Sequence, residues 1–121
     1  MRLRAFRKRL IISKIGGKIM GIVIINKDNF KEEVLDVTTT VLVDFYATWC
    51  GPCQMMHPVM DKLAAEREDV KICKIDVDQE RDLAMQYKVM SIPTFLVFKN
   101  VEVVNRAMGA QPQEAIEELL K

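Results

Sequence analysis

From Ile22 to the end of the chain, short β-branched runs alternate with segments of helical periodicity, and this alternation constrains the fold more than any other sequence feature. Each change of pattern coincides with a capping or turn residue. The predicted order is strand, helix, strand, helix, strand, helix, strand, strand and helix. This order predicts an α/β domain in which helices flank a central mixed β-sheet.

The predicted strands and helices have the following approximate bounds. The strands cover residues 22–25, 41–46, 70–75, 94–98 and 102–107. The helices cover the apolar positions from Phe30 to Val37, the stretch from the cysteine pair to about Arg67, residues 79–87, and the segment after Pro112. Pro58 lies inside the second helix, where its missing N–H and its ring predict a kink.

Charge divides the chain into two parts. Its 121 residues are half hydrophobic, enough for one core, and the formal charge of +1 gives no reason to expect a nucleic-acid partner. Seven of the 18 Lys and Arg residues fall within the first nineteen positions, which contain no Asp or Glu. We therefore expect residues 1–19 to be a basic extension, disordered or upstream of a true start at Met20, and residues 20–121 to form the domain. Targeting or attachment to an anionic surface is the alternative for the extension.

Hydropathy and cysteine usage predict where the protein works. No stretch approaches the roughly 18 apolar residues of a membrane span, and the apolar run at residues 10–12 is too short for a signal peptide. Three cysteines do not form a disulfide framework, and two of them lie in a C-x-x-C pair within an α/β pattern. The sequence thus predicts a cytoplasmic protein with no membrane contact and with redox chemistry in a reducing compartment.

Cys50 and Cys53 stand at the predicted start of a helix, where their positions differ electrostatically. Unpaired backbone N–H groups and the helix dipole stabilise a thiolate at Cys50, which lowers its pKa. Cys53 lies nearly one turn further in, and we expect it to be buried and suited to attack a mixed disulfide. The rigid, uncharged pair Gly51-Pro52 favours a reducing potential.

A zinc site is the main alternative use of these cysteines. Cys50, Cys53, His57 and Cys73 nominally supply four ligands. The rigidity of the residues between the first two cysteines and the strand position of Cys73 argue against it. The sequence therefore predicts no metal, and Cys73 is expected to be a small buried hydrophobic residue.

The segment Trp49-Cys50-Gly51-Pro52-Cys53, preceded by Val43-Asp44-Phe45-Tyr46-Ala47, resembles the thioredoxin family. The resemblance extends over residues 20–121. Its further landmarks are Pro58, the strand at residues 70–78, Ile92-Pro93-Thr94-Phe95 and Gly109-Ala110. The resemblance implies the thioredoxin fold.

The resemblance also implies roles for Asp44 and Lys74. Asp44 corresponds to a buried carboxylate beneath the cysteine pair, and Lys74 to its cationic neighbour. A carboxylate in an apolar strand has a raised pKa, which suits it to accept the proton of Cys53 during resolution.

Substrate binding is implied at two places. The Ile92-Pro93 bond is expected to be cis, so that the Ile92 backbone pairs with an extended substrate segment. The other implied contact residues are Trp49, Gly51, Pro52 and Gly109.

The resulting interpretation is a monomeric general protein-disulfide reductase that acts on disulfide-containing proteins. The family implies re-reduction by a flavin-containing thioredoxin reductase, and no cofactor is expected on this chain. The alternatives are a disulfide oxidant or isomerase, and a non-catalytic binding module with the same fold.

Three positions call for separate expectations. His57 is expected to be a helix-surface residue. Gln54 replaces a lysine that is common in the family, which removes a positive charge near the thiols. Val101 stands where glycine is usual in the hairpin, and because a β-branched residue resists positive φ, we expect this turn to adopt another geometry.

Overall fold

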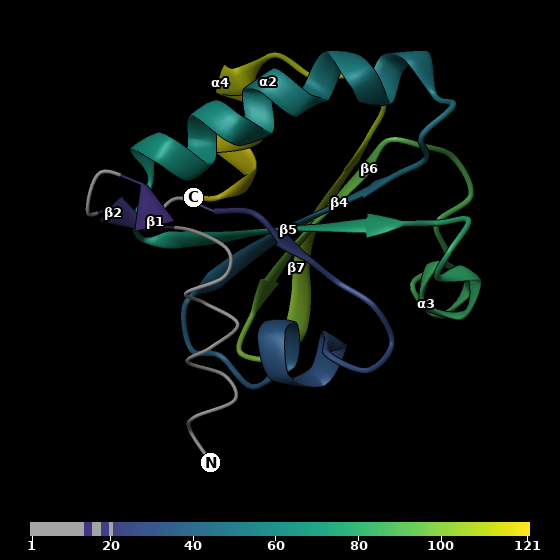
Figure 1. Cartoon of the computed structure of the whole chain (residues 1–121), viewed down its shortest axis with the longest axis horizontal. Helices are drawn as coiled ribbons and strands as arrows, with labels where there is room; N and C mark the ends of the chain where they lie inside the picture. The colour runs from purple at the N-terminus through teal and green to yellow at the C-terminus, as the bar shows by residue number, and fades with distance from the viewer. Residues whose placement is uncertain (1–13, 16–17, 20) are drawn as a thin grey trace.

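A mixed five-stranded sheet forms the centre of the molecule (Figure 1). This computed structural model describes residues 14–15, 18–19 and 21–121. The strands, in spatial order, are β3 (Val23–Ile24), β5 (Val70–Asp76), β4 (Thr40–Tyr46), β6 (Thr94–Lys99) and β7 (Glu102–Met108). β5 pairs in parallel with β3 and β4, whereas the pairs β4–β6 and β6–β7 are antiparallel. The predicted mixed sheet and strand order along the chain are confirmed.

Helices cover both faces of this sheet (Figure 1). They are η1 (Lys31–Leu35), α2 (Gly51–Glu66), α3 (Arg81–Gln86) and α4 (Gln113–Leu119). α2 and α4 lie over one face, and η1 and α3 lie on the other side. η1 is a single π-helical segment, closed by the amide of Asp36 donating to the carbonyl of Lys31, and it is shorter than the predicted helix.

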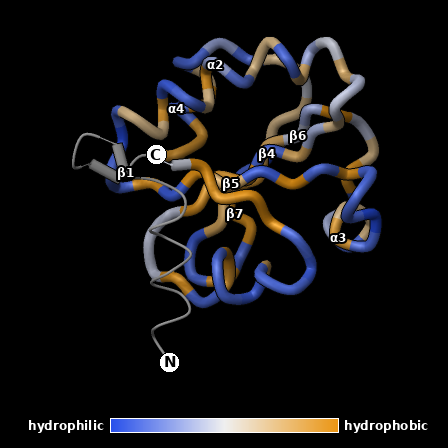
Figure 2. Tube along the Cα trace, viewed as in Figure 1, coloured by the Kyte–Doolittle hydropathy of each residue, from blue (hydrophilic) through white to orange (hydrophobic). Residues whose placement is uncertain are grey.

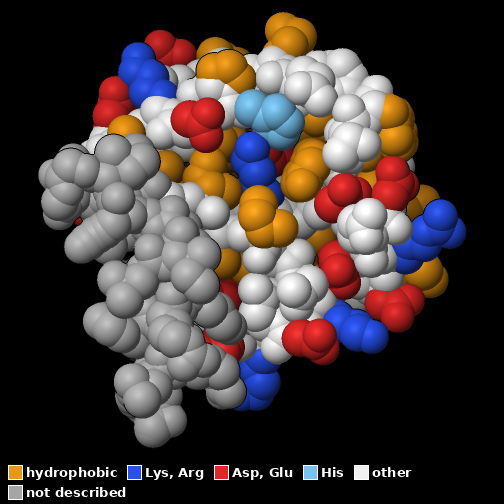
Figure 3. Space-filling model, in the orientation of Figure 1, with side chains coloured by type: hydrophobic (Ala, Val, Ile, Leu, Met, Phe, Trp, Pro, Cys, Tyr) orange, Lys and Arg blue, Asp and Glu red, His pale blue; other side chains and the backbone are white. Residues whose placement is uncertain are grey.

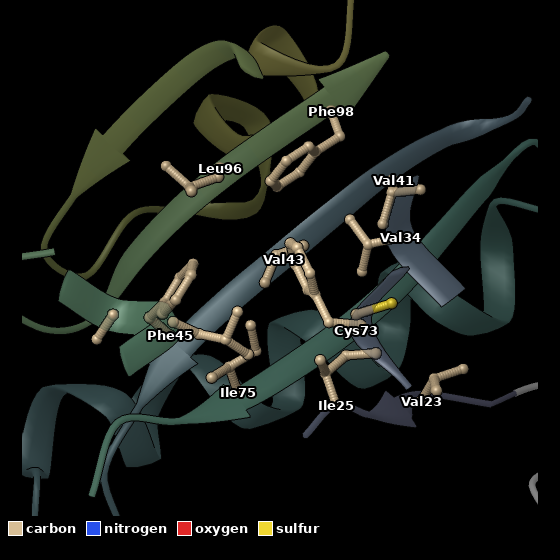
Figure 4. Close-up of a cluster of buried hydrophobic side chains, with 13 residues drawn as sticks. Val23, Ile25, Val34, Val41, Val43, Phe45, Cys73, Ile75, Leu96 and Phe98 are labelled. Atoms are coloured by element: carbon tan, nitrogen blue, oxygen red, sulfur yellow. The ribbon is translucent and has the colours of Figure 1, made fainter. Parts of the chain in front are cut away.

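The central strands contribute side chains to two separate cores because successive strand residues point to opposite faces. Hydrophobic residues accordingly concentrate in the middle of the molecule (Figure 2). The core beneath α2 and α4 comprises Leu42, Met56, Met60, Leu63, Val70, Ile72, Phe95, Val97, Ile116 and Leu120. The opposite core, drawn in Figure 4, includes Val23, Ile25, Val34, Val41, Val43, Phe45, Cys73, Ile75, Leu96 and Phe98.

The turn between β6 and β7 corrects one sequence prediction. Lys99 pairs with Glu102, so only Asn100 and Val101 connect the two strands. Their φ angles are 52° and 79°, so Val101 adopts the positive φ that we expected it to avoid. The prediction was wrong because a two-residue connection has to match the right-handed twist of both strands, and this requirement outweighs the preference of the side chain.

The start of the described chain contains a small antiparallel ribbon. β1 (Lys14–Ile15) pairs with β2 (Lys18–Ile19). The rest of the predicted extension, residues 1–13, 16 and 17, lies outside the described residues, so the domain boundary at residue 20 stays a prediction. Among the helices of the described part, none has the length and apolar character needed to cross a bilayer.

Candidate active site

The two cysteines of the motif lie at the N-terminus of α2. Cys50 is the N-cap residue, and its extended backbone (φ −89°, ψ 115°) places its Sγ 3.2 Å from the amide nitrogen of Cys53, which donates to it. The two sulfurs are joined in a disulfide, with Cα atoms 5.2 Å apart. Pro52 fits the first turn because the amides there need no intrahelical acceptor.

The two sulfurs differ in their access to solvent. Cys53 is fully buried, whereas Cys50 retains 4% of its surface. Gly51 and Pro52, between them, are exposed. Of the two cysteines, Cys50 is therefore the one that retains contact with solvent.

Trp49 presents a large apolar surface next to the cysteine pair. Its side chain is 71% exposed, although its Nε1 donates a hydrogen bond of 2.8 Å to Oδ2 of Asp78. This bond links the loop before α2 to the loop after β5. The indole is thus held in one orientation while most of its surface remains available for contact.

A second loop also approaches Cys50. The Ile92–Pro93 bond is cis, as the resemblance implied, and the carbonyl oxygen of Ile92 lies 4.0 Å from Sγ of Cys50. The amide of Gly109 donates to the carbonyl of Pro93 at 2.8 Å, and its φ of 87° is one that glycine adopts without steric cost. The loops before β6 and after β7 therefore meet beside the reactive sulfur.

Asp44 lies on the face of the sheet that α2 covers. It is fully buried, and no group among the described residues hydrogen-bonds to either of its carboxylate oxygens. Burial raises the pKa of Asp44 to about 7, and the charge of Lys74 acts in the opposite direction. Lys74 is its direct partner in the β4–β5 register, so the two side chains point to the same face.

His57 is the residue that the sequence interpretation underestimated. It is half-buried rather than a simple surface residue, and its Nδ1 lies 2.7 Å from Nζ of Lys74. Figure 3 shows the histidine beside a basic side chain on the face of the molecule. Its ring also meets that of Tyr46 edge-on at 5.7 Å, and the Lys74 ammonium lies 5.8 Å from the Tyr46 ring centroid. The available signal was spacing, because His57 is four residues after Cys53 and so shares its helix face.

Cys73 faces away from this site. It belongs to the opposite core, where it is fully buried as predicted, and burial raises the pKa of its thiol to about 12. The four residues considered as zinc ligands therefore do not converge, because Cys73 and α2 lie on opposite faces of the sheet. Within the described residues, no three His, Cys, Asp or Glu side chains are grouped so that they would hold a metal ion.

Known proteins resemble this chain over most of its length. The thioredoxin family model matches residues 21–121. Thioredoxin of Bacillus subtilis is 47% identical over 102 residues, which cover 84% of this chain and 96% of that protein. Thioredoxin 1 of Nostoc is 41% identical over 98 residues, or 80% of this chain and 92% of the relative. The solved structure of a mutant thioredoxin from Halobacterium salinarum matches with a TM-score of 0.76 at 38% identity, covering 82% of this chain and 87% of that one.

Proposed function

This chain belongs to the thioredoxin family, and from that premise we propose that it acts as a general protein-disulfide reductase in the cytoplasm. The protein is a thiol-disulfide oxidoreductase with Cys50 and Cys53 as its redox pair. The direction of exchange is the part that we propose. The uncharged residues Gly51 and Pro52 support it, because they add no group that would stabilise the reduced form strongly enough to make the pair an oxidant.

The reaction begins at Cys50. In the reduced protein its thiolate caps α2, where free N–H groups and the helix dipole stabilise the negative charge. The thiolate attacks one sulfur of a substrate disulfide, forming a Cys50–substrate disulfide and releasing the other substrate sulfur as a thiolate. The accessible edge of Cys50 between exposed neighbours supports this order of events.

Cys53 completes the reaction. Its sulfur attacks Sγ of Cys50, which forms the Cys50–Cys53 disulfide and releases the second substrate thiolate, so that the substrate gains two electrons and the protein loses two. The proton of Cys53 has to leave before this attack. We assign its transfer to Asp44, directly or through water, because a carboxyl with a pKa of about 7 accepts and returns protons at neutral pH.

Substrate binding is proposed along the surface around Cys50. The Ile92 carbonyl lies 4.0 Å from the sulfur, which supports a role in aligning an extended peptide, and Gly109 borders the same loop. The exposed indole of Trp49, the residue before Cys50, offers apolar contact. Contacts made mostly through backbone and apolar surface suit many disulfide-containing proteins rather than one sequence.

The catalytic cycle requires an electron donor. We propose that a flavin-containing thioredoxin reductase restores the Cys50 and Cys53 thiols by the same exchange run in reverse. The protein itself is expected to act as a monomer without a cofactor.

The observation that carries the proposal is the Cys50–Cys53 disulfide at the N-terminus of α2 with the Ile92 carbonyl beside its outer sulfur. Its test is the redox potential of the pair, followed by Trp49 fluorescence in dithiothreitol buffers of known potential. We expect a value near the thioredoxin potential of about −270 mV, whereas one above about −200 mV would favour the oxidant or isomerase alternative.

Trapping distinguishes an enzyme from a binding module. The Cys53→Ser variant cannot resolve its intermediate, so it should accumulate Cys50-linked mixed disulfides with a disulfide-containing protein such as insulin. The Cys50→Ser variant is the matched control and should accumulate few. Equal amounts with both variants would contradict the proposed order of attack.

A further inference from the structure

The hydrogen bonding of Lys74 differs from what its position in the sheet suggests. It is the direct neighbour of Asp44 in the β4–β5 register and is almost fully buried. Its Nζ nevertheless lies 2.7 Å from Nδ1 of His57, while the Asp44 oxygens accept no hydrogen bond from the described residues. The ammonium group therefore acts on the carboxylate through charge attraction and not through a direct bond.

The chemistry of this contact fixes the state of the imidazole. An ammonium group has no lone pair, so Lys74 is the donor and Nδ1 is the acceptor, with the ring proton on Nε2. Desolvation and the charge of Lys74 lower the pKa of His57, and Asp61 on the same helix opposes this shift. The ring thus remains a neutral acceptor at the pH near 7 where Asp44 titrates.

We propose that His57 is a positioning residue, whose Nδ1 holds the Lys74 ammonium off the Asp44 carboxylate and thereby limits how strongly this cation stabilises the ionised form. The inference rests on the proposed role of Asp44 as proton acceptor for Cys53. Without the imidazole, a nearly buried ammonium group would need another acceptor, and the unsatisfied oxygens of Asp44 are the adjacent anionic ones. His57 therefore keeps the proton affinity of Asp44 high enough for exchange at neutral pH.

The other ionisable groups around His57 do not provide a cation that could link it to the Asp44 carboxylate. Tyr46 of β4 packs edge-on against the ring, and burial together with Asp76 and Asp44 raises the pKa of its phenol. Asp61 is on the helix that carries His57. Lys74 is therefore the cation through which His57 acts on the carboxylate.

The test is the carboxyl titration of Asp44, followed by carbon-13 NMR in the oxidised full-length protein, with Asp44→Asn to assign the signal. His57→Leu retains side-chain bulk but removes the acceptor, and we expect it to lower the Asp44 midpoint by about 1 pH unit as Lys74 moves onto the carboxylate. His57→Asn places an amide oxygen near the position of Nδ1, so it should retain the wild-type midpoint.

A double-mutant cycle tests whether the effect passes through Lys74. In a Lys74→Met background, His57→Leu should leave the Asp44 midpoint unchanged. An unchanged or raised midpoint in His57→Leu alone, or the same shift in both backgrounds, would overturn the proposal. Thermal unfolding of each variant confirms that the titrated species is folded.

The pH profile of mixed-disulfide resolution separates this inference from the proposed function. If His57 positions Lys74 and Asp44 accepts the proton, His57→Leu should shift both the NMR midpoint and the resolution profile to lower pH. A shift in the NMR midpoint alone would support the role of His57 and contradict the proton transfer to Asp44.

Discussion

Two neighbouring positions of the β4–β5 pair place buried titratable groups on opposite faces of one sheet. Val43 pairs with Cys73, and Asp44 pairs with Lys74. The thiol of Cys73 packs among aliphatic and aromatic side chains (Figure 4), with the Lys71–Glu33 ion pair on the same side of the sheet. The Asp44 carboxylate instead lies under α2 with Lys74 beside it. One residue along each strand thus separates a thiol in a hydrophobic core from the carboxylate that we propose as a proton acceptor.

Burial raises the pKa of both groups by similar amounts, yet with opposite consequences. Burial raises the pKa of the Asp44 carboxyl from 3.8 to about 7, a value that allows proton exchange at neutral pH. Burial raises the pKa of the Cys73 thiol from 9.0 to about 12, so we expect this cysteine to stay protonated and unreactive. The residue type, more than the size of the shift, decides whether the buried group titrates near neutral pH.

The largest expected effect separates the cysteines of the two faces. Cys50→Ser should lower protein-disulfide reduction by more than about 10³-fold, because the attacking thiolate is lost. Cys73→Ala should leave the rate within about twofold, because this thiol stays protonated in a closed core. Insulin reduction with dithiothreitol measures both. A large loss of activity in the folded Cys73 variant would break the comparison.

The second effect concerns stability as a function of pH. Unfolded Asp44 ionises near 3.8 and folded Asp44 near 7, so the wild type loses stability as pH rises between these values. Asp44→Asn lacks this loss. Between pH 4 and pH 8, its free energy of unfolding relative to that of wild type should therefore increase by on the order of 4 kcal/mol.

Urea unfolding of both proteins at several pH values gives this difference. Wild type and Asp44→Asn share all other titrating groups. The contributions of those groups to the pH dependence of stability therefore cancel in the difference. Parallel stability curves across the pH range would show that Asp44 ionises normally in the folded state.

A third, smaller effect tests the apolar character of Cys73. Cys73→Ala should lower the free energy of unfolding by about 1 to 2 kcal/mol, because it leaves a small cavity in a closed core. Cys73→Ser is the matched variant and should cost more, because it buries a hydroxyl among apolar side chains. Equal stability of the serine variant and wild type would mean that the Cys73 site accommodates a hydroxyl group without loss.

The smallest expected effect concerns a residue that belongs to neither the Asp44 site nor the Cys73 site and so serves as a control. Val101 holds a φ of 79° in the β6–β7 turn, a conformation that β-branched residues rarely adopt. Val101→Gly should raise the free energy of unfolding by about 1 kcal/mol without changing the Asp44 titration. Thermal unfolding measures the gain, and a loss of stability would show that the valine is accommodated without strain.

Periodicity and capping were sufficient to predict the order of elements because β4 and β6 bury nearly continuous apolar runs and α2 buries one apolar face. The disulfide between Cys50 and Cys53 and the burial of Asp44 agree with what the family motif implied. The roles of the site residues remain predictions that the experiments above address.

Two features lay beyond the sequence for physical reasons. The turn at Val101 depends on the twist of two strands, which overrides the local preference of one residue. The contact between His57 and Lys74 joins α2 to β5 across 17 positions, and nothing local to either residue specifies it. Long-range contacts of this kind require the three-dimensional arrangement.

The parallel pairing of β4 with β5 also has an evolutionary consequence. Asp44 and Lys74 share a face only because seven consecutive residue pairs keep one register from Thr40–Val70 to Tyr46–Asp76. Loops can gain or lose residues without altering this alignment, but a single insertion within either strand would send one of the two charges to the opposite face. Length changes among descendants of this protein should therefore accumulate in its loops and spare these two strands.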